Sequence, residues 1–284
     1  MAEKITTLAY NSGVNFFDTA EFYSEGQAER TLGKILKSKG WSSPTERTLS
    51  RKRIIEGLMG SLERLQLHYV DIVLVSRDPE RICTIEEIVR ACSFVVHQGW
   101  AFYWGTSDWT PEDIKEAYTV ARLFHLTPPS LESLEFNLFQ REFHEFGMSE
   151  LCSKLGMGLI SGVPLAQGIL SGKYGDKIPR YSRASLQSQV GLRKQILSKE
   201  GQEQLMQVSQ LSKLANRLGI SLPQLSIAWC LKSNHINCVI LGAATVDQLQ
   251  ENLGAISAVS ALSNAVLGEI ENILVSDHQS EDFL

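Results

Sequence analysis

The chain has 284 residues, of which 43% are hydrophobic and 21% are charged, and its formal net charge is -5. This composition is ordinary for a globular protein, and the length suits one large α/β domain. The acidic balance argues against nucleic acid or an anionic membrane surface as a partner, because both are bound by basic faces.

The cysteines and histidines carry no metal or disulfide pattern. The five cysteines are odd in number, no two have C-x-x-C spacing, and the six histidines show no H-x-x-x-H arrangement. We therefore expect reduced, mostly buried thiols and no metal site. No apolar run reaches the length of a membrane span, and residues 1–12 lack a signal-peptide core. We expect a cytosolic protein that does not insert into a membrane itself.

Apolar periodicity predicts helices that alternate with short strands along the chain. The first helix is expected at Ala2–Asn11, followed by a buried strand at 13–20. Further helices are expected at 26–39, 50–67, 84–98, 111–124, 147–155, 202–218, 222–233 and 246–255, the last of which closes the regular part. Further strands are expected at 70–75, 100–106, 130–136, 157–163 and 238–241.

Continuous apolar strands between helices predict a parallel sheet that is buried on both faces. No Pro/Gly/Ser-rich linker interrupts the chain, so we expect a single domain over residues 1–284. A closed parallel βα barrel needs eight strands, and only about six are recognisable. No strand precedes the first helix, and Trp41–Leu49 is too polar and too short for a buried strand. The pattern predicts an incomplete TIM-type (β/α)8 barrel.

Several segments, in order along almost the whole chain, resemble the aldo-keto reductase family, and more narrowly its beta subunits of voltage-gated potassium channels. They are N-F-F-D-T-A-E-F-Y (15–23), L-S-R-K-R-I-I-E-G-L (49–58), S-L-E-R-L-Q-L (61–67), Y-W-G-T-S-D-W (103–109), L-F-Q-R-E (138–142), G-I-L-S-G-K-Y (168–174), Y-S-R-A-S-L (181–186), A-W-C-L (228–231) and L-G-A-A-T-V-D-Q-L-Q-E-N-L-G-A-I (241–256).

The resemblance implies a barrel that binds NADP(H) without a Rossmann domain. No G-x-G-x-x-G follows a strand in this chain, which agrees with that implication. The resemblance also implies a homo-tetramer that docks on the cytoplasmic assembly domain of the potassium channel alpha subunits. The expected location is then the cytoplasm, at the plasma membrane only through the channel.

For catalysis, the resemblance assigns Tyr23 to the residue that supplies a proton while NADPH supplies a hydride, and Asp18 to the carboxylate that pairs with a lysine beside the tyrosine. A tyrosine hydroxyl titrates near pH 10 in water and needs a neighbouring lysine to be tuned. The strand that carries this lysine in the family is the one predicted to be missing. Lys37, Lys39 and Lys52 are expected on helix surfaces, and Ser76 takes the substrate-orienting position. We therefore expect weak or absent reductase activity.

For the cofactor, the resemblance assigns the adenosine-phosphate end to Gly242, Gln248, Glu251 and Asn252, and the basic clamp on the phosphates to Lys173 and Arg183. Taken alone, Thr245-x-x-Gln248 is an ordinary helix cap, and the two basic residues are solvated loop charges. On the nicotinamide side Ser107 matches, and Pro164, Leu165 and Ala166 follow a Gly-Val pair where the family has Trp-Ser.

Two substitutions on the nicotinamide side predict weakened NADP(H) binding. Asp108 stands where the family has arginine, and Ser133 stands where it has glutamine. An acid at the first position repels phosphate. The leading interpretation is a channel beta subunit with impaired catalysis. The alternatives are an NADPH-dependent aldehyde or ketone reductase, and a non-functional truncated isoform.

Overall fold

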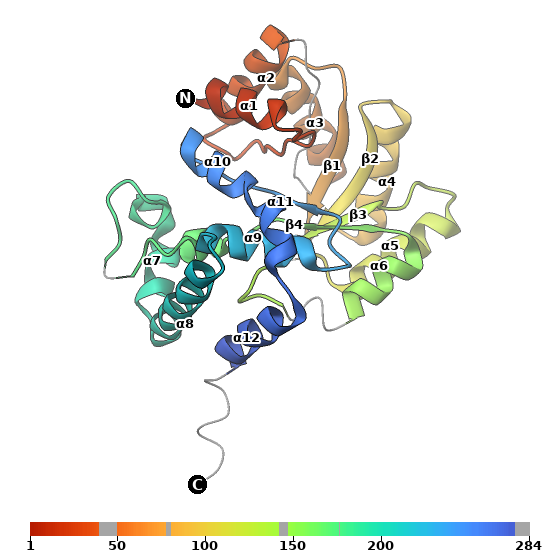
Figure 1. Ribbon diagram of the computed structural model, residues 1–284. Helices are drawn as coiled ribbons and strands as arrows, with labels where there is room; N and C mark the ends of the chain where they lie inside the picture. The colour runs from red at the N-terminus through yellow and green to blue at the C-terminus, as the bar shows by residue number, and fades with distance from the viewer. Residues whose placement is uncertain (40–49, 78–80, 142–146, 176, 276–284) are drawn as a thin grey trace. The chain divides into compact units, whose positions relative to one another are not determined.

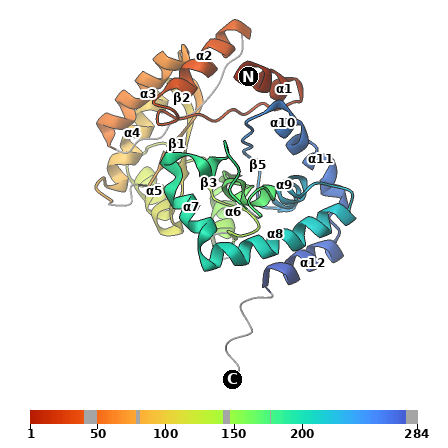
Figure 2. The same ribbon diagram turned by 90° about the vertical axis from the view of Figure 1, so that its left-hand side faces the viewer.

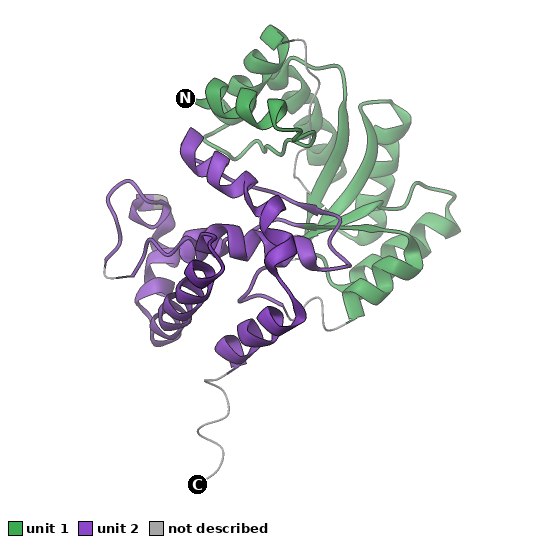
Figure 3. Cartoon of the chain, viewed as in Figure 1, with its two compact units in different colours: residues 1–134, 144–160 green, residues 135–143, 161–284 purple. Residues whose placement is uncertain are grey.

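The computed structural model describes residues 1–39, 50–77, 81–141, 147–175 and 177–275 (Figure 1). The chain divides into two compact units, coloured separately in Figure 3: unit 1 is residues 1–134 and 144–160, and unit 2 is residues 135–143 and 161–284. The segment 40–49, on which the predictions of a missing strand and a missing lysine depend, lies outside the described residues.

Unit 1 begins with three helices and continues as alternating strands and helices. Its elements are α1 (Ala2–Asn11), α2 (Gln27–Lys39), α3 (Arg51–Leu65), β1 (Val70–Ser76), α4 (Ile85–His97), β2 (Ala101–Ser107), α5 (Pro111–Leu123), β3 (Leu131–Leu134), α6 (Ser149–Leu155) and β4 (Gly158–Ser161). The strands lie in the order β1-β2-β3-β4, and both β1 with β2 and β2 with β3 are parallel. The predicted parallel α/β arrangement is confirmed for these strands.

The helices of unit 1 start where short polar side chains cap them. Ser50, Thr84 and Thr110 each accept a hydrogen bond from the backbone N–H three residues further on, at the starts of α3, α4 and α5. Each cap satisfies a donor that the first turn leaves without a helical partner. In α4, the buried positions Ile88, Cys92 and Val95 recur at helical spacing, so one face of this helix lies in the core.

Helices α2 and α3 approach each other closely enough to exclude any side chain larger than glycine at one position. A Cβ atom on Gly33 would lie 2.3 Å from the Leu65 carbonyl oxygen. The Glu29 carboxylate, which has no exposed surface, pairs at 2.5 Å with the Arg64 guanidinium across the same two helices. The close approach leaves no room for water, so the buried charge needs this partner.

Unit 2 is mostly helical. Its elements are η2 (Ala166–Ser171), η3 (Arg183–Ser185), η4 (Gln187–Gln189), α7 (Val190–Leu197), α8 (Lys199–Arg217), α9 (Leu222–Lys232), β5 (Cys238–Val239), α10 (Val246–Leu253), α11 (Ala255–Ala258), η5 (Val259–Ala261) and α12 (Asn264–Val275). Most residues of α9 are buried, and the helix begins with a capping box formed by Ser221 and Gln224. This helix is therefore the central element of the unit.

Two predictions about regular structure were wrong at the ends of the chain. Residues 14–20 form no strand, and within the described residues they pair with no other strand. A strand is stable only on a ladder of hydrogen bonds with a neighbour, so apolar residues alone do not make one. At the other end, helix α12 continues the regular part well beyond 246–255. It packs beside α8 (Figure 2), where the Gln207 side chain donates to the Leu274 carbonyl.

Among the described residues, no single helix is long and apolar enough to cross a membrane; Val246–Ala261 and Asn264–Val275 reach that length and composition only together, across a bend of 113°. Four of the five cysteines are buried, which confirms that part of the prediction. No group of three metal-ligating side chains occurs in the parts of the chain that the structure describes.

Candidate functional site

The carboxyl ends of β1, β2 and β3 carry a row of three serines. Ser76 is the register partner of Ser107, and Ser107 is the register partner of Ser133. Neighbouring parallel strands present such partners on the same face of the sheet. The sequence analysis had marked all three positions separately, and the structure brings them together. The Ser76 hydroxyl is buried and has no hydrogen-bond partner in the described residues.

The turn after β2, residues 107–110, is fixed to both neighbouring strands. The Asp108 backbone N–H donates to the Ser133 carbonyl at 3.1 Å, and the Arg77 backbone N–H donates to the Ser107 carbonyl at 3.3 Å. Asp108 has a φ angle of 57°, a left-handed conformation that costs energy for any residue with a side chain. Its carboxylate is exposed at the carboxyl-terminal end of the strands, beside the Ser107 hydroxyl.

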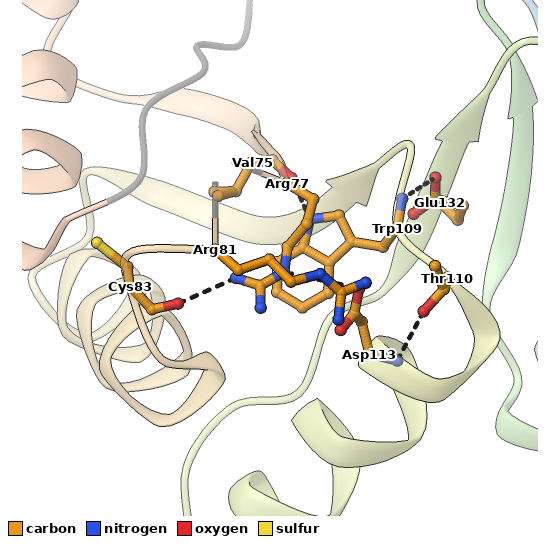
Figure 4. Close-up of polar contacts among 8 residues, drawn as sticks. All are labelled: Val75, Arg77, Arg81, Cys83, Trp109, Thr110, Asp113 and Glu132. Atoms are coloured by element: carbon orange, nitrogen blue, oxygen red, sulfur yellow. Dashed lines mark hydrogen bonds and ion pairs between the residues drawn. The ribbon is translucent and has the colours of Figure 1, made fainter. Parts of the chain in front are cut away.

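Trp109, which belongs to this turn, is bonded to Glu132 of β3 (Figure 4). The Trp109 side chain is fully buried, and its indole N–H donates to the Val75 carbonyl at 2.8 Å. The Trp109 backbone N–H donates to Glu132 Oε1 at 3.3 Å. Burial raises the pKa of Glu132 to about 8, and the nearby Asp108 carboxylate raises it too, while the Thr106 hydroxyl and the backbone N–H groups of the turn oppose that rise.

An ion cluster lies along the other side of Trp109 (Figure 4). The buried Asp113 carboxylate, in the first turn of α5, lies 3.6 Å from Arg77 and 3.5 Å from Arg81. The Arg77 guanidinium lies 5.6 Å from the Trp109 ring centre and donates to the Cys83 carbonyl. The cluster fixes the chain just after β1 and so supports the end of that strand.

The structure describes Asp18 and Tyr23 on the connection between α1 and α2. Asp18 is half-buried, next to the buried Thr19 and Ala20. The Tyr23 ring is 40% exposed and packs edge-on against Phe22 with ring centres 4.7 Å apart. A turn with three consecutive left-handed residues, Ser24 to Gly26, leads from Tyr23 into α2. Unusual backbone of this kind is common at binding sites, and it is consistent with the position that the resemblance assigns to Tyr23.

The three lysines considered in the sequence analysis lie on helix surfaces. Lys37 donates to the Gln66 side chain at 3.1 Å, Lys39 pairs with Glu3 at 3.4 Å, and Lys52 pairs with Glu56 at 3.8 Å. None of these three lies at a strand end. Residues 40–49 contain no lysine in the sequence, although their structure lies outside the described residues.

In unit 2, Pro164, Leu165 and Ala166 lie in the turn after β4. Pro164 and Ala166 are buried, whereas Leu165 is half-buried. Ala166, Gln167 and Gly168 have φ angles of 44°, 55° and 97° in succession, which is a strained conformation for the first two. The Asn137 side chain donates to the Val163 carbonyl at 3.0 Å and so supports this turn.

The predicted phosphate clamp, Lys173 and Arg183, is brought together by Tyr174. The Lys173 ammonium lies 5.2 Å from the centre of the buried Tyr174 ring, and the Tyr174 hydroxyl accepts a hydrogen bond from the Ala184 backbone N–H. Arg193 donates to the carbonyls of Ala184 and Ser185 and fixes this short helix to α7. Both Lys173 and Arg183 are exposed and thus accessible to an anion.

The predicted adenosine-phosphate residues lie along α10 and in the segment just before it. Gln248 Oε1 accepts a hydrogen bond from the Ala244 backbone N–H, and the Gln248 backbone N–H donates to Thr245 Oγ1. Gln248 and Thr245 therefore shape the turn that contains the exposed Gly242. Glu251 is exposed, and Asn252 is buried on α10. A Cβ atom on Gly242 would meet nothing within 4 Å, so protein packing does not require glycine there.

Unit 2 fits the phosphate part of a dinucleotide better than unit 1 fits its nicotinamide part. The Ser182 hydroxyl is buried beside Arg183 and has no hydrogen-bond partner in the described residues, as expected for a group that binds a ligand oxygen. Two exposed cations and a capped helix start are the usual phosphate ligands. In unit 1, by contrast, the exposed Asp108 carboxylate repels phosphate.

The parallel strands of unit 1 end in polar residues, and unit 2 holds two exposed cations and a capped helix start; both features are compatible with an α/β scaffold of the barrel-enzyme class. Residues 1–275 match the model of the Aldo/keto reductase family, and the chain belongs to this family. The predicted family is thereby confirmed, as is an oxidoreductase scaffold of a kind that binds NAD(P)H. The narrower resemblance to potassium channel beta subunits stays a prediction.

Three residues of these clusters were not named by the sequence analysis: Glu132, Trp109 and Ser182. Glu132 had only a weak signal, because the expected strand 130–136 reads S-L-E-S-L-E-F and contains a second acid, Glu135. Trp109 and Ser182 lie within segments quoted for the family resemblance, but nothing in the local pattern marks an indole that bonds to a neighbouring strand or a hydroxyl that lacks a partner.

Proposed function

We propose that the chain is a regulatory beta subunit of a voltage-gated potassium channel, built on a dinucleotide-binding aldo-keto reductase scaffold with impaired catalysis. The observation that carries the second half of this proposal is the serine row. The ends of β1, β2 and β3 offer three hydroxyls, while Lys37, Lys39 and Lys52 are held on helix surfaces. A hydroxyl supplies a hydrogen bond but no positive charge to tune a general acid.

The channel role rests on the sequence segments that resemble channel beta subunits. The expected partner is the cytoplasmic assembly domain of a channel alpha subunit, bound by a homo-tetramer of this chain in the cytoplasm. In this role the bound NADP(H) acts as a regulatory ligand. The phosphate groups are held by Lys173 and Arg183, with Ser182 as an additional donor.

Within this proposal each side chain has a limited task. A bound nicotinamide would supply or accept a hydride. Ser76, Ser107 and Ser133 orient polar groups at the sheet edge. Tyr23 presents a hydroxyl from an exposed ring, and Asp18 presents a carboxylate that disfavours the phenolate form of a neighbouring phenol. Binding and orientation are thus retained, whereas activation of the proton donor is lost.

The deciding experiment combines four measurements on the purified chain. A thermal melt with and without NADPH tests cofactor binding, because a ligand that binds only the folded chain raises the midpoint. Reduction of a simple aldehyde, measured beside an intact family member, tests catalysis; we expect a rate lower by roughly 10²–10⁴-fold. Co-purification with the cytoplasmic domain of a channel alpha subunit tests docking, and light scattering of the complex tests the tetramer.

The alternative function is an NADPH-dependent aldehyde or ketone reductase, which the retained Asp18 and Tyr23 favour. It predicts a rate equal to that of the intact member and loss of that rate in Tyr23→Phe. The second alternative, a non-functional truncated isoform, predicts no cooperative melt and rapid proteolysis. The first result would refute impaired catalysis, and the second would refute the proposed binding role.

A further inference from the structure

Glu132 is the one described group of unit 1 whose burial, hydrogen bonding and charge environment conflict. Its carboxyl has no exposed surface, and Oε2 has no hydrogen-bond partner. Oε1 accepts a long bond from the Trp109 backbone N–H, and the Thr106 hydroxyl and the Asp108 backbone N–H also act on the carboxyl as hydrogen-bond donors. A carboxylate in such a place pays a large desolvation cost, so a neutral carboxylic acid is favoured.

Burial outweighs the neighbours that favour the charged form of Glu132, which are the Thr106 hydroxyl and the backbone N–H groups of Asp108 and Trp109. In the turn after β2, Asp108 carries a like charge, and on α6 the Cys152 thiol lies close enough for Glu132 to raise the pKa of that thiol. The cations of this region lie elsewhere: Arg77 and Arg81 pair with Asp113 along the Trp109 ring. On α5, Tyr118 interacts electrostatically with Cys152 and donates to the Pro129 carbonyl.

The bond that Glu132 accepts belongs to the turn that carries Ser107 and Asp108. That turn is held by the Asp108 N–H on the Ser133 carbonyl and by the Trp109 indole on the Val75 carbonyl. It also stores the strain of the left-handed Asp108. When Glu132 ionises, opening of the strained turn lowers the desolvation cost of the carboxylate, because water then reaches it.

We propose that Glu132 is a positioning residue and a pH-responsive latch: the neutral carboxyl holds the turn at residues 107–110 closed, and its ionisation opens that turn. The step is the loss of one proton from the Glu132 carboxyl to solvent. The row formed by Ser76, Ser107 and Ser133 is ordered in the closed form. In the open form Ser107 and Asp108 leave the edge of the sheet.

The test is an NMR titration of the full-length chain labelled with ¹⁵N-tryptophan, between pH 6 and 10. The signals of Trp109 are assigned by their loss in Trp109→Phe. In the parent chain, the Trp109 backbone and indole N–H signals should shift together with one midpoint near the pKa of Glu132, about 8. The signals of Trp229, which lies in unit 2, should not follow that midpoint.

Three variants separate the latch from other titrating groups. Glu132→Gln keeps the shape and stays neutral, so its Trp109 signals should show no midpoint. Asp108→Asn removes a like charge and should move the midpoint to lower pH. Cys152→Ser should keep a midpoint near that of the parent, because burial raises the pKa of Cys152 to about 11.

Two results would overturn the proposal. One is a Trp109 signal that stays fixed across the whole titration of the parent chain. The other is a midpoint that persists in Glu132→Gln, since the proton would then belong to another group. If Glu132→Gln failed to fold, Asp108→Asn would decide alone, and an unchanged midpoint in that variant would refute the latch.

Discussion

The indole N–H of Trp109, in the turn after β2, donates at 2.8 Å to the carbonyl oxygen of Val75, near the end of β1. This bond ties the turn after β2 to the last part of β1. Both groups are fully buried, so neither has water as a substitute partner. The bond supports the serine row, because Ser76 directly follows Val75 and Ser107 is the first residue of the turn.

Replacing Trp109 should lower the free energy of unfolding, because the hydrogen bond to the Val75 carbonyl is lost. Trp109→Phe leaves the Val75 carbonyl buried without its partner and opens a small cavity, so the free energy of unfolding should fall by about 2–4 kcal/mol. Urea unfolding followed by circular dichroism measures the change. Tyr103→Phe is the control, since Tyr103 is 57% exposed and should change stability by no more than about 0.5 kcal/mol. Equal effects of the two changes would contradict the prediction.

The contact between α2 and α3 should be intolerant of one added methyl group. Gly33→Ala would place Cβ 2.3 Å from the Leu65 carbonyl oxygen, so the helices must separate. The expected loss is roughly 1–3 kcal/mol or more, because overpacking is not relieved by side-chain rotation here.

The matched control for that change is Gly268→Ala in α12. An added Cβ there meets nothing within 4 Å. Alanine also has the higher helix propensity, so this variant should gain up to about 1 kcal/mol. Thermal melts of the two variants should therefore shift in opposite directions. A Gly33→Ala variant as stable as the parent would show that α2 and α3 do not pack as described.

Glu132 should make the chain less stable as the pH rises. Its pKa is about 8 in the folded chain against an ordinary value of 4.5. Below pH 4.5 both the folded and the unfolded chain hold the Glu132 proton, and the contribution of this group to the free energy of unfolding is fully present. Between the two values only the folded state holds it, so stability falls by about 1.4 kcal/mol per pH unit. Above the higher value the loss from this group is complete.

Urea unfolding at pH 5, 7 and 9 measures this dependence. Glu132→Gln has no proton to lose, and the part of the slope that belongs to this group should disappear. The variant should therefore be more stable than the parent at pH 9, while the difference narrows or reverses at pH 5. Parallel slopes in the two proteins would mean that Glu132 titrates normally.

Asp108 should weaken NADPH binding through its charge. Asp108→Arg replaces the repulsive acid with a cation at the sheet edge, so the affinity for NADPH should rise by about tenfold. Fluorescence titration measures it. Glu116→Arg makes the same charge change on the exposed face of α5 and should leave the affinity nearly unchanged. An increase in both variants would indicate only a general effect of net charge, and no increase in Asp108→Arg would refute the repulsion.

The sequence predicted most helices and five of the strands because their signals are local. The apolar run Val70–Val75 and the capping threonines Thr84 and Thr110 each determine their own element. The strand expected at 13–20 failed because a strand also needs a neighbour, and periodicity does not report one. Helix α12 was missed because no strong signal in the sequence before its polar first residue, Asn264, separates it from the preceding helical segment.

The candidate site was predictable residue by residue but not as an arrangement. Ser76, Ser107 and Ser133 were assessed one at a time against a family pattern, and only the strand register shows that they form a row. The state of Glu132 depends on desolvation by elements far apart in the chain, which no local pattern encodes. Lys173 and Arg183 came from the resemblance alone; the structure shows both as exposed, and their role in binding phosphate stays a prediction.

Four thiols are buried, those of Cys83, Cys92, Cys152 and Cys230. Burial raises the pKa of Cys152 to about 11 and that of Cys230 to about 12. Because only a thiolate is alkylated quickly, these sulfurs become reactive when the chain around them opens. Three of them belong to unit 1 and one to unit 2. The chain therefore contains built-in reporters of local opening, and the order in which an alkylating reagent modifies them reveals which unit loosens first.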